Sequence, residues 1–231
     1  MEAFCQVPGK VPVKLPLLDT GKEKAYTDTM KTSNKFTLTR IVIAPVFFIL
    51  YYIPVWFDIQ NALVLKALTF ILIPLLAFAE FTDYLDGHFA RKHNEVSDFG
   101  KMFDPFADVF LHLSTFTCFV FSGYMPAILY VLILYREFSQ NFLRMVAAKQ
   151  GTAIAARKGG KLKTVSYVTA CFLSLVQECL LRSGLAAAWG LDMGLFRNIG
   201  IAVYLLCAIL AYISFIDYLR HFGSVLKDAA A

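Results

Sequence analysis

Residues 83–108 read DYLDGHFARKHNEVSDFGKMFDPFAD, an acidic stretch that connects two of the longest apolar segments of the chain. A helix needs about 20 mostly apolar residues to cross a bilayer. Six segments meet this need, and they are residues 36–57, 62–81, 103–123, 126–148, 165–181 and 199–216. The sequence therefore predicts an all-α, polytopic membrane protein with six transmembrane helices.

The composition excludes most other classes of protein. Of the 231 residues, 58% are hydrophobic and 17% are charged, whereas soluble domains have about 25% charged residues. With 22 Phe and 11 Tyr the chain is too apolar for a disordered protein. The five cysteines form no CxxC pair, and we predict neither a disulfide nor a zinc site.

Lysine and arginine predict the orientation, because cytoplasmic segments of membrane proteins collect them. If the N-terminus is inside, the outer side receives only Lys66, Arg182 and Arg197. We therefore expect both termini, the loop between the second and third spans and the loop between the fourth and fifth spans to lie in the cytoplasm. Residues 1–33 are expected to form a juxtamembrane segment, 34–220 the six-helix domain and 221–231 a tail. The net charge of +5 is a membrane-surface signal, and no nucleic-acid partner is expected.

Four acids of the opening stretch are regularly spaced, namely Asp83, Asp86, Asp104 and Asp108. Residues three or four apart share one face of a helix, so each pair presents its carboxylates together. Because a short loop makes the two helices neighbours, the pairs are expected to meet. Grouped acids in a membrane need a cation, and oxygen ligands favour Mg²⁺ or Mn²⁺, here two ions. The alternative is that the acids are solvated or are paired with Arg91 and Lys101.

Small residues accompany these acids. Gly87 and Ala90 follow Asp83 on its own helical face, and Gly100 precedes Asp104 by one turn. They would leave a shallow floor on which a flat nucleotide could rest. Arg91 adds a permanent cation suited to phosphate. The stretch therefore indicates phosphate chemistry.

These eight positions resemble the DxxDGxxARx₈GxxxDxxxD signature of the CDP-alcohol phosphotransferases. The resemblance covers about residues 34–220 and implies a six-helix membrane fold. It implies transfer of a phosphatidyl or related group from a CDP-linked lipid to an alcohol, with release of CMP. A homodimer is the usual assembly of that family.

The resemblance also implies roles for individual residues. Asp83, Asp86, Asp104 and Asp108 would hold the metal ions, and Asp108 would also be the catalytic base for the acceptor hydroxyl. The expected CDP-lipid-binding residues are Asn34, Thr37, Arg40, Asp83, Gly87, Ala90, Arg91 and Gly100.

The acceptor alcohol is predicted from two further segments. REFSQNFLRMVAAKQG (residues 136–151) and GKLKT (160–164) resemble segments of the bacterial phosphatidylglycerophosphate synthases, as does NKFTLTR (34–40) at the first span. Arg136, Arg144, Lys161 and Lys163 would bind the phosphate of an anionic acceptor. The alternatives are positive-inside anchoring and, for Arg136, a pair with Glu137.

We therefore predict an enzyme of phospholipid biosynthesis that transfers the phosphatidyl group of CDP-diacylglycerol to sn-glycerol 3-phosphate, forming phosphatidylglycerol phosphate. Other acceptors remain open, namely inositol phosphate, serine or phosphatidylglycerol. Hypotheses of other classes are a divalent-cation transporter and a lipid-binding scaffold without turnover.

Overall fold

The structure of the protein is a computed structural model that describes residues 32–92, 98–149 and 158–230. The helices belong to one compact unit, Lys31–Ala231. Most of the predicted juxtamembrane segment and nearly all of the loop at 151–160 lie outside the described residues.

All regular secondary structure in the described chain is α-helical, and the described residues contain no strand. Each predicted apolar segment lies almost wholly within one long helix, and a short helix, α6, occupies part of the connection before the last one. The helices are α1 Thr32–Trp56, α2 Ala62–Lys92, α3 Asp98–Phe121, α4 Ala127–Lys149, α5 Lys158–Arg182, α6 Leu185–Ala188 and α7 Met193–Ala230.

Four of the described helices are long and apolar enough to cross a membrane: Lys35–Trp56, Ala62–Asp83, Gly160–Arg182 and Met193–Gly223. The helices α3 and α4 are long, but the polar side chains that they carry lower their mean hydropathy. The all-α membrane class is therefore confirmed, and four of the six predicted spans are supported.

Local sequence sets the helix ends. The side chain of Asn61 accepts hydrogen bonds from the backbone of Leu63 (2.9 Å) and Val64 (3.3 Å), which caps the start of α2. The Asp192 side chain caps α7 in the same way. Between α3 and α4 the chain turns at Gly123, whose φ of 78° suits glycine.

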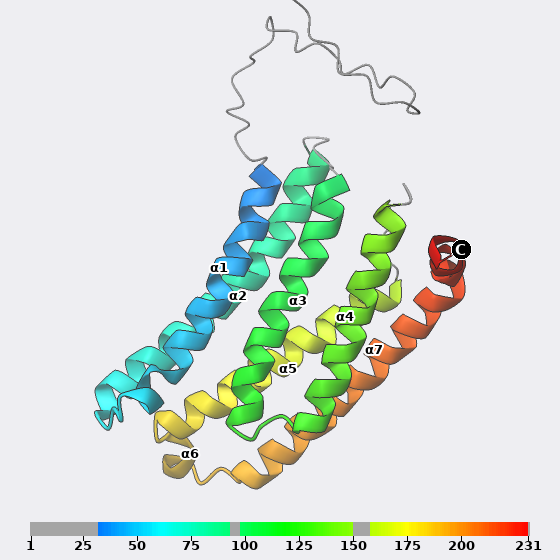
Figure 1. Cartoon of the computed structure of the whole chain (residues 1–231). Helices are drawn as coiled ribbons and strands as arrows, with labels where there is room; N and C mark the ends of the chain where they lie inside the picture. The colour runs from blue at the N-terminus through cyan, green and yellow to red at the C-terminus, as the bar shows by residue number, and fades with distance from the viewer. Residues whose placement is uncertain (1–31, 93–97, 150–157, 231) are drawn as a thin grey trace, which may run out of the picture. The chain divides into compact units, whose positions relative to one another are not determined.

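The helices pack so that a site can form between them (Figure 1). Helix α1 lies against α2 and α3, whereas α5 contacts α2, α3 and α7, and α4 contacts α3 and α7. Three small residues, Ala44, Ala79 and Ala107, are fully buried on α1, α2 and α3. Small side chains allow helix backbones to approach closely. One turn or less from these alanines lie Arg40, Asp83 and Asp108.

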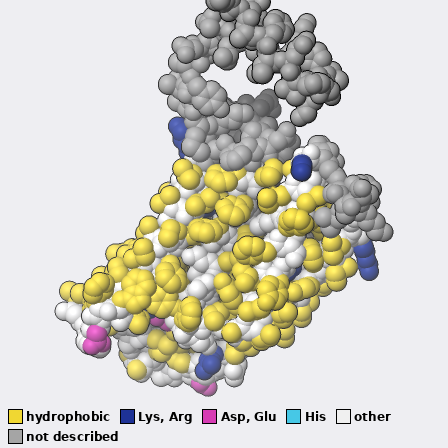
Figure 2. Space-filling view, in the orientation of Figure 1, with side chains coloured by type: hydrophobic (Ala, Val, Ile, Leu, Met, Phe, Trp, Pro, Cys, Tyr) yellow, Lys and Arg dark blue, Asp and Glu magenta, His cyan; other side chains and the backbone are white. Residues whose placement is uncertain are grey.

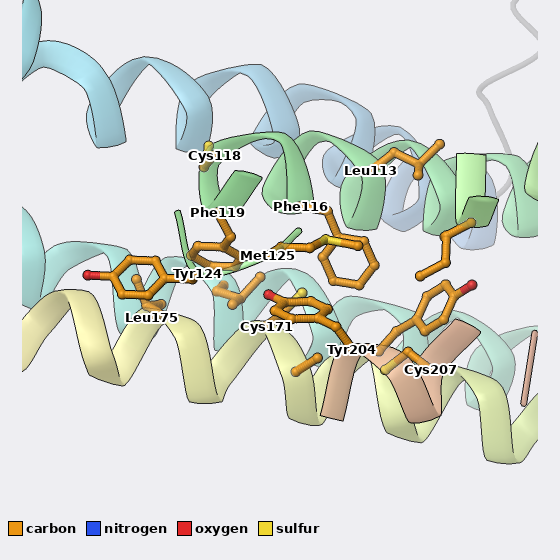
Figure 3. Packing of buried hydrophobic residues seen from close by; sticks show 14 of the residues in the cluster. Leu113, Phe116, Cys118, Phe119, Tyr124, Met125, Cys171, Leu175, Tyr204 and Cys207 are labelled. Atoms are coloured by element: carbon orange, nitrogen blue, oxygen red, sulfur yellow. The ribbon is translucent and has the colours of Figure 1, made fainter. Parts of the chain in front are cut away.

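Aromatic side chains pack together with aliphatic side chains and cysteines in the buried core that α3, α5 and α7 share (Figure 3). The Phe116 ring lies with its centroid 5.3 Å from that of Tyr167 and 5.4 Å from that of Tyr204, both edge-on. All three side chains are buried. We call these three residues the aromatic layer.

The lateral surface is apolar. Figure 2 shows hydrophobic side chains over the sides of the helices, and the few charged side chains visible there lie toward the two ends. Large apolar side chains are exposed on α2, α4 and α7, among them Phe70, Phe78, Phe138, Phe142, Ile209 and Ile213. A water-soluble monomer rarely exposes so continuous an apolar surface. The protein is a membrane protein.

Candidate active site

The centre of the site is a buried arginine between two acids. Arg40 of α1 is fully buried, and its Nη1 donates a hydrogen bond of 2.6 Å to Oδ1 of Asp83 on α2. The same Nη1 contacts Oδ1 of Asp108 on α3. The side chains of Asp83 and Asp108 are 44% and 28% exposed, so both acids also face outward from the arginine. Three helices thus bring their charges together at one point.

A second contact ties α1 to α3 beside this point. The buried Thr37 hydroxyl donates a hydrogen bond of 2.6 Å to Oδ1 of Asp104. Gly100, one turn earlier on α3, is also buried. We predicted Thr37 and Arg40 as residues that bind the CDP-lipid, and the structure places both in direct contact with the acids. The sequence analysis did not foresee these contacts.

Five residues of the predicted site have side chains that lie outside the described part of the structure. Their backbone lies in α1 and α2, and the residues are Asn34, Asp86, Gly87, Ala90 and Arg91. Their roles stay predictions.

A polar cavity of about 560 Å³ opens beside the two acids. Side chains from α2, α3, α4, α5 and α7 line this space, which we call the site cavity. Its polar lining residues are Asp83, Asp108, His112, Arg136, Glu137, Gln140, Arg144, Lys161, Lys163, Thr164 and Tyr218. All four residues that were predicted to bind the acceptor phosphate therefore line the same cavity as two of the predicted metal ligands.

Glu137 organises the cationic side of the site cavity. Its Oε1 accepts hydrogen bonds from Arg136 Nη1 (2.7 Å), Lys163 Nζ (2.8 Å) and the Tyr167 hydroxyl (2.9 Å). The Arg136 Nε donates to the backbone carbonyl of Ala211 at 2.9 Å, which fixes α4 against α7. The pairing of Arg136 with Glu137, which the sequence left open, is therefore present. Lys163 and Tyr167 could not be assigned to this group from sequence spacing.

Arg144 and Lys161 are less constrained. An Nη2 of Arg144 lies 3.5 Å from the Tyr218 hydroxyl, and its guanidinium carbon lies 5.6 Å from the centroid of that ring. The Arg144 Nε is buried and has no hydrogen-bond partner among the described residues. Lys161 is exposed. Both cations are thus available to an anion that enters the site cavity.

A buried pair on α2 and α3 was missed by the sequence analysis. His112 Nε2 lies 3.2 Å from Glu80 Oε1, and the two side chains are 5% and 17% exposed. His112 follows Asp108 by one turn and lines the site cavity. Glu80 precedes Asp83 by three residues. The spacing of each residue from a motif acid was the signal that could have identified the pair.

The acids suit hard divalent cations by the chemistry of their donor atoms, since carboxylate oxygens are the preferred ligands of Mg²⁺ and Mn²⁺. Asp83 and Asp108 already share one positive charge, that of Arg40. Among the side chains that the structure describes, no group of three His, Cys, Asp or Glu is close enough to hold a metal ion. Asp86, the fourth predicted ligand, lies outside that set.

The site cavity therefore combines acids at one side with cations at the other. Carboxylates held near a positive charge can accept a proton from a hydroxyl, and arginine and lysine bind phosphate. The arrangement suits a small molecule that carries both a hydroxyl and a phosphate.

Comparison with known proteins agrees with this chemistry. The family model for CDP-alcohol phosphatidyltransferase matches residues 30–210 of the chain. A CDP-diacylglycerol–glycerol-3-phosphate 3-phosphatidyltransferase of Treponema pallidum is 39% identical over 203 residues, which are 86% of this chain and 92% of the relative. A protein of the same name from Bacillus subtilis is 37% identical over 147 residues, 59% of this chain and 72% of the relative. A third, from Rickettsia typhi, is 38% identical over 133 residues, 57% of this chain and 68% of the relative.

Proposed function

Because the chain belongs to the CDP-alcohol phosphatidyltransferase family, we propose that it transfers the phosphatidyl group of CDP-diacylglycerol to sn-glycerol 3-phosphate. The products are phosphatidylglycerol phosphate and CMP. The relatives from three bacteria carry the name of this activity. The proposal places the protein in phospholipid biosynthesis.

One observation carries the choice of acceptor. Arg136, Arg144, Lys161 and Lys163 line the same site cavity as Asp83 and Asp108. Glu137 offsets part of this positive charge, but Arg144 and Lys161 have no acidic partner in the described contacts. A phosphate dianion gains charge-assisted hydrogen bonds on that side. A neutral or zwitterionic alcohol would leave the cations without a ligand.

The acids supply the chemistry at the other end of the acceptor. With its phosphate on the cations, the acceptor can direct its primary hydroxyl toward Asp108. We propose that Asp108 takes the hydroxyl proton as the oxygen forms a bond to the phosphatidyl phosphorus. The bond from that phosphorus to the CMP oxygen breaks, and CMP leaves with the electron pair. Arg40 and Thr37 hold the carboxylates in place throughout.

We propose that Asp83, Asp86, Asp104 and Asp108 hold two Mg²⁺ or Mn²⁺ ions. When bound, these ions would neutralise the pyrophosphate of the CDP-lipid and polarise the reacting oxygens. The carboxylate donor set supports this proposal. Removal of divalent ions with EDTA is expected to abolish CMP release, and added Mg²⁺ or Mn²⁺ is expected to restore it. Activity that persists in EDTA would contradict the metal proposal.

The finer membrane arrangement is also a proposal. We propose that α3 and α4 cross the membrane with the four apolar helices, since α3 packs against α1 and α5, and α4 packs against α7, in the same unit. Six spans would place both termini and the site cavity in the cytoplasm of a bacterium, at the inner membrane. We further propose that the protein is a homodimer, as the resemblance implies.

The decisive experiment is an acceptor panel. The purified protein, in detergent micelles with radiolabelled CDP-diacylglycerol and Mg²⁺, receives sn-glycerol 3-phosphate, inositol phosphate, serine or phosphatidylglycerol separately. Labelled product is expected with sn-glycerol 3-phosphate, together with an equal amount of CMP. Conversion of only a neutral or zwitterionic alcohol would show that the acceptor is wrong while the family chemistry stands.

Cation transport receives no comparable support. A transporter needs a polar path to the far side of the membrane. In the described structure His112 lines the site cavity, and two rings of the aromatic layer pack against it, with centroids 5.7 Å away for Tyr167 and 6.4 Å away for Phe116. Proteoliposomes that take up Mg²⁺ without releasing CMP would reverse this judgement.

A further inference from the structure

Gln140 is a polar residue of the site cavity to which the reaction, as described so far, gives no role. It lies on α4, one turn after Arg136 and one turn before Arg144. Its side chain is 4% exposed and lines the cavity. Its Oε1 is buried and has no hydrogen-bond partner among the described residues. Buried polar atoms nearly always have partners in a working structure, so this oxygen indicates a ligand.

The chemistry of the unpartnered atoms limits what that ligand can be. A carbonyl oxygen only accepts hydrogen bonds, so it requires a donor such as a hydroxyl and is repelled by a phosphate dianion. The Arg144 Nε, four residues away, only donates and therefore suits the phosphate. Residues one turn apart on a helix are separated by about 6 Å along its axis. The two atoms together match a short molecule with a phosphate and a hydroxyl.

We propose that Gln140 is a specificity-determining residue that accepts a hydrogen bond from the secondary, non-reacting hydroxyl of the acceptor. This inference rests on the proposed function, in which the phosphate lies on the cations and the primary hydroxyl is directed toward Asp108. Gln140 precedes Arg144 by one turn on α4 and lines the same cavity as Asp108, so an acceptor with its phosphate at Arg144 can bring the neighbouring secondary hydroxyl to the amide. The amide therefore selects vicinal hydroxyls in a phosphorylated acceptor.

Recognition of this kind works mainly by rejection. A buried group that is built to bind a hydroxyl stays unpaired when an analogue lacks it, and the analogue is disfavoured. The analogue 3-hydroxypropyl phosphate has the same phosphate and primary hydroxyl but no secondary hydroxyl. We expect the wild-type protein to use it with kcat/KM lower than that for sn-glycerol 3-phosphate by about ten-fold or more.

The test measures kcat/KM for both acceptors with wild-type protein and Gln140→Met, which keeps the length of the side chain but removes the amide. We expect the substitution to lower kcat/KM for sn-glycerol 3-phosphate by about ten-fold and to change that for the analogue little, so that the preference disappears. Asn141→Leu is the matched control, because Asn141 is the adjacent amide on α4 and lines an apolar groove between α3 and α4 instead. It should retain the full preference.

The possible results separate the two proposals. Equal losses for both acceptors in Gln140→Met, or an unchanged preference, overturn the role of Gln140 and leave the proposed function intact. Equal use of both acceptors by the wild-type protein also overturns the role of Gln140. This comparison needs no variant, so it still decides the question if Gln140→Met is not monodisperse in gel filtration. Conversion of neither acceptor by the wild type overturns the proposed function, and this inference with it.

Discussion

Arg40 places a permanent charge where the membrane protein has no water to solvate it. The side chain is fully buried, and it contacts carboxylates on two other helices. Removal of one partner from such a group leaves the other buried charges uncompensated. The resulting loss of stability is larger than the stability that the intact ion pair contributes. Arg40 and the acids therefore depend on one another, and the acids keep a fixed position before any substrate binds.

Asp108→Asn tests the catalytic role of one of these acids. The amide keeps the size of the side chain but cannot take a proton, so we expect turnover to fall by about 10² or more while Mn²⁺ binding is largely retained. CMP release and Mn²⁺ binding, followed by electron paramagnetic resonance, measure the two effects.

The matched control for this variant is Asp58→Asn, at an exposed acid in the turn that follows α1. It should leave CMP release unchanged. If Asp108→Asn released CMP at the normal rate, Asp108 would not be the base. The scaffold hypothesis would instead be favoured if the wild-type protein bound Mn²⁺ and CDP-diacylglycerol and released no CMP.

At the scale of elements, the contact of α1, α2 and α3 depends on small side chains. Ala44 and Ala79 are fully buried and share a cluster with Ile43 and Leu111. A larger residue at this contact would separate the backbones, and Arg40 could no longer reach both acids. The apolar packing and the charged site are therefore linked through helix separation.

Ala79→Leu is the corresponding test. Added methylenes in a packed contact cost about 1 to 3 kcal/mol, so we expect a lower thermal midpoint in detergent and a clear loss of CMP release. Ala77→Leu adds the same atoms to an exposed position of the same helix and should change neither. Wild-type behaviour of Ala79→Leu would show that the contact is not tight.

The sequence predicts the helices well because lipid-facing segments must be apolar along their whole length. It predicts their ends poorly, since apolarity marks the part that is buried in lipid, whereas backbone hydrogen bonding continues beyond it. For this reason α2 runs to Lys92 and not to residue 81, and α7 covers Met193–Ala230 and not only 199–216. The cap of α7 at Asp192 could have been anticipated from its residue type.

The site, like the helices, has some features that the sequence predicts and others that it does not. Helical spacing within one segment predicts that Asp104 and Asp108 share a face. The short loop predicts that α2 and α3 are direct neighbours, whereas in the described structure α1 packs against both of them and the two meet through side chains such as Glu80 and His112. Contacts between distant segments, such as Arg40 with Asp83 or Glu80 with His112, depend on helix rotation and depth. Neither quantity is encoded in periodicity, so these partners emerge only from the folded structure.

On the scale of the whole molecule, the two ends of the helices differ. The site cavity lies near the C-terminal ends of α2 and α4 and the N-terminal end of α5. The turn that holds Gln60 lies at the opposite end of α2. The distribution of lysine and arginine predicts that the end with the site cavity is cytoplasmic.

Single cysteines test this orientation, in a chain whose Cys5 is replaced by serine and whose described cysteines are buried. We expect a membrane-impermeant maleimide to label Gln60→Cys in intact cells. It should label Lys149→Cys, at the exposed end of α4, only after the cells are lysed. The reverse pattern would place the active site outside.

The aromatic layer next to His112 has a further consequence for the cell. A water-filled hollow that enters a membrane from one side is a hazard if it continues to the other, since protons and metal ions would then leak along the electrochemical gradient. Next to His112, which lines the site cavity, the buried Phe116 ring packs edge-on against the rings of Tyr167 and Tyr204. If the proposed acceptor binds in the site cavity, this packing would let a hydrated phosphorylated molecule enter between the helices without opening a leak across the membrane.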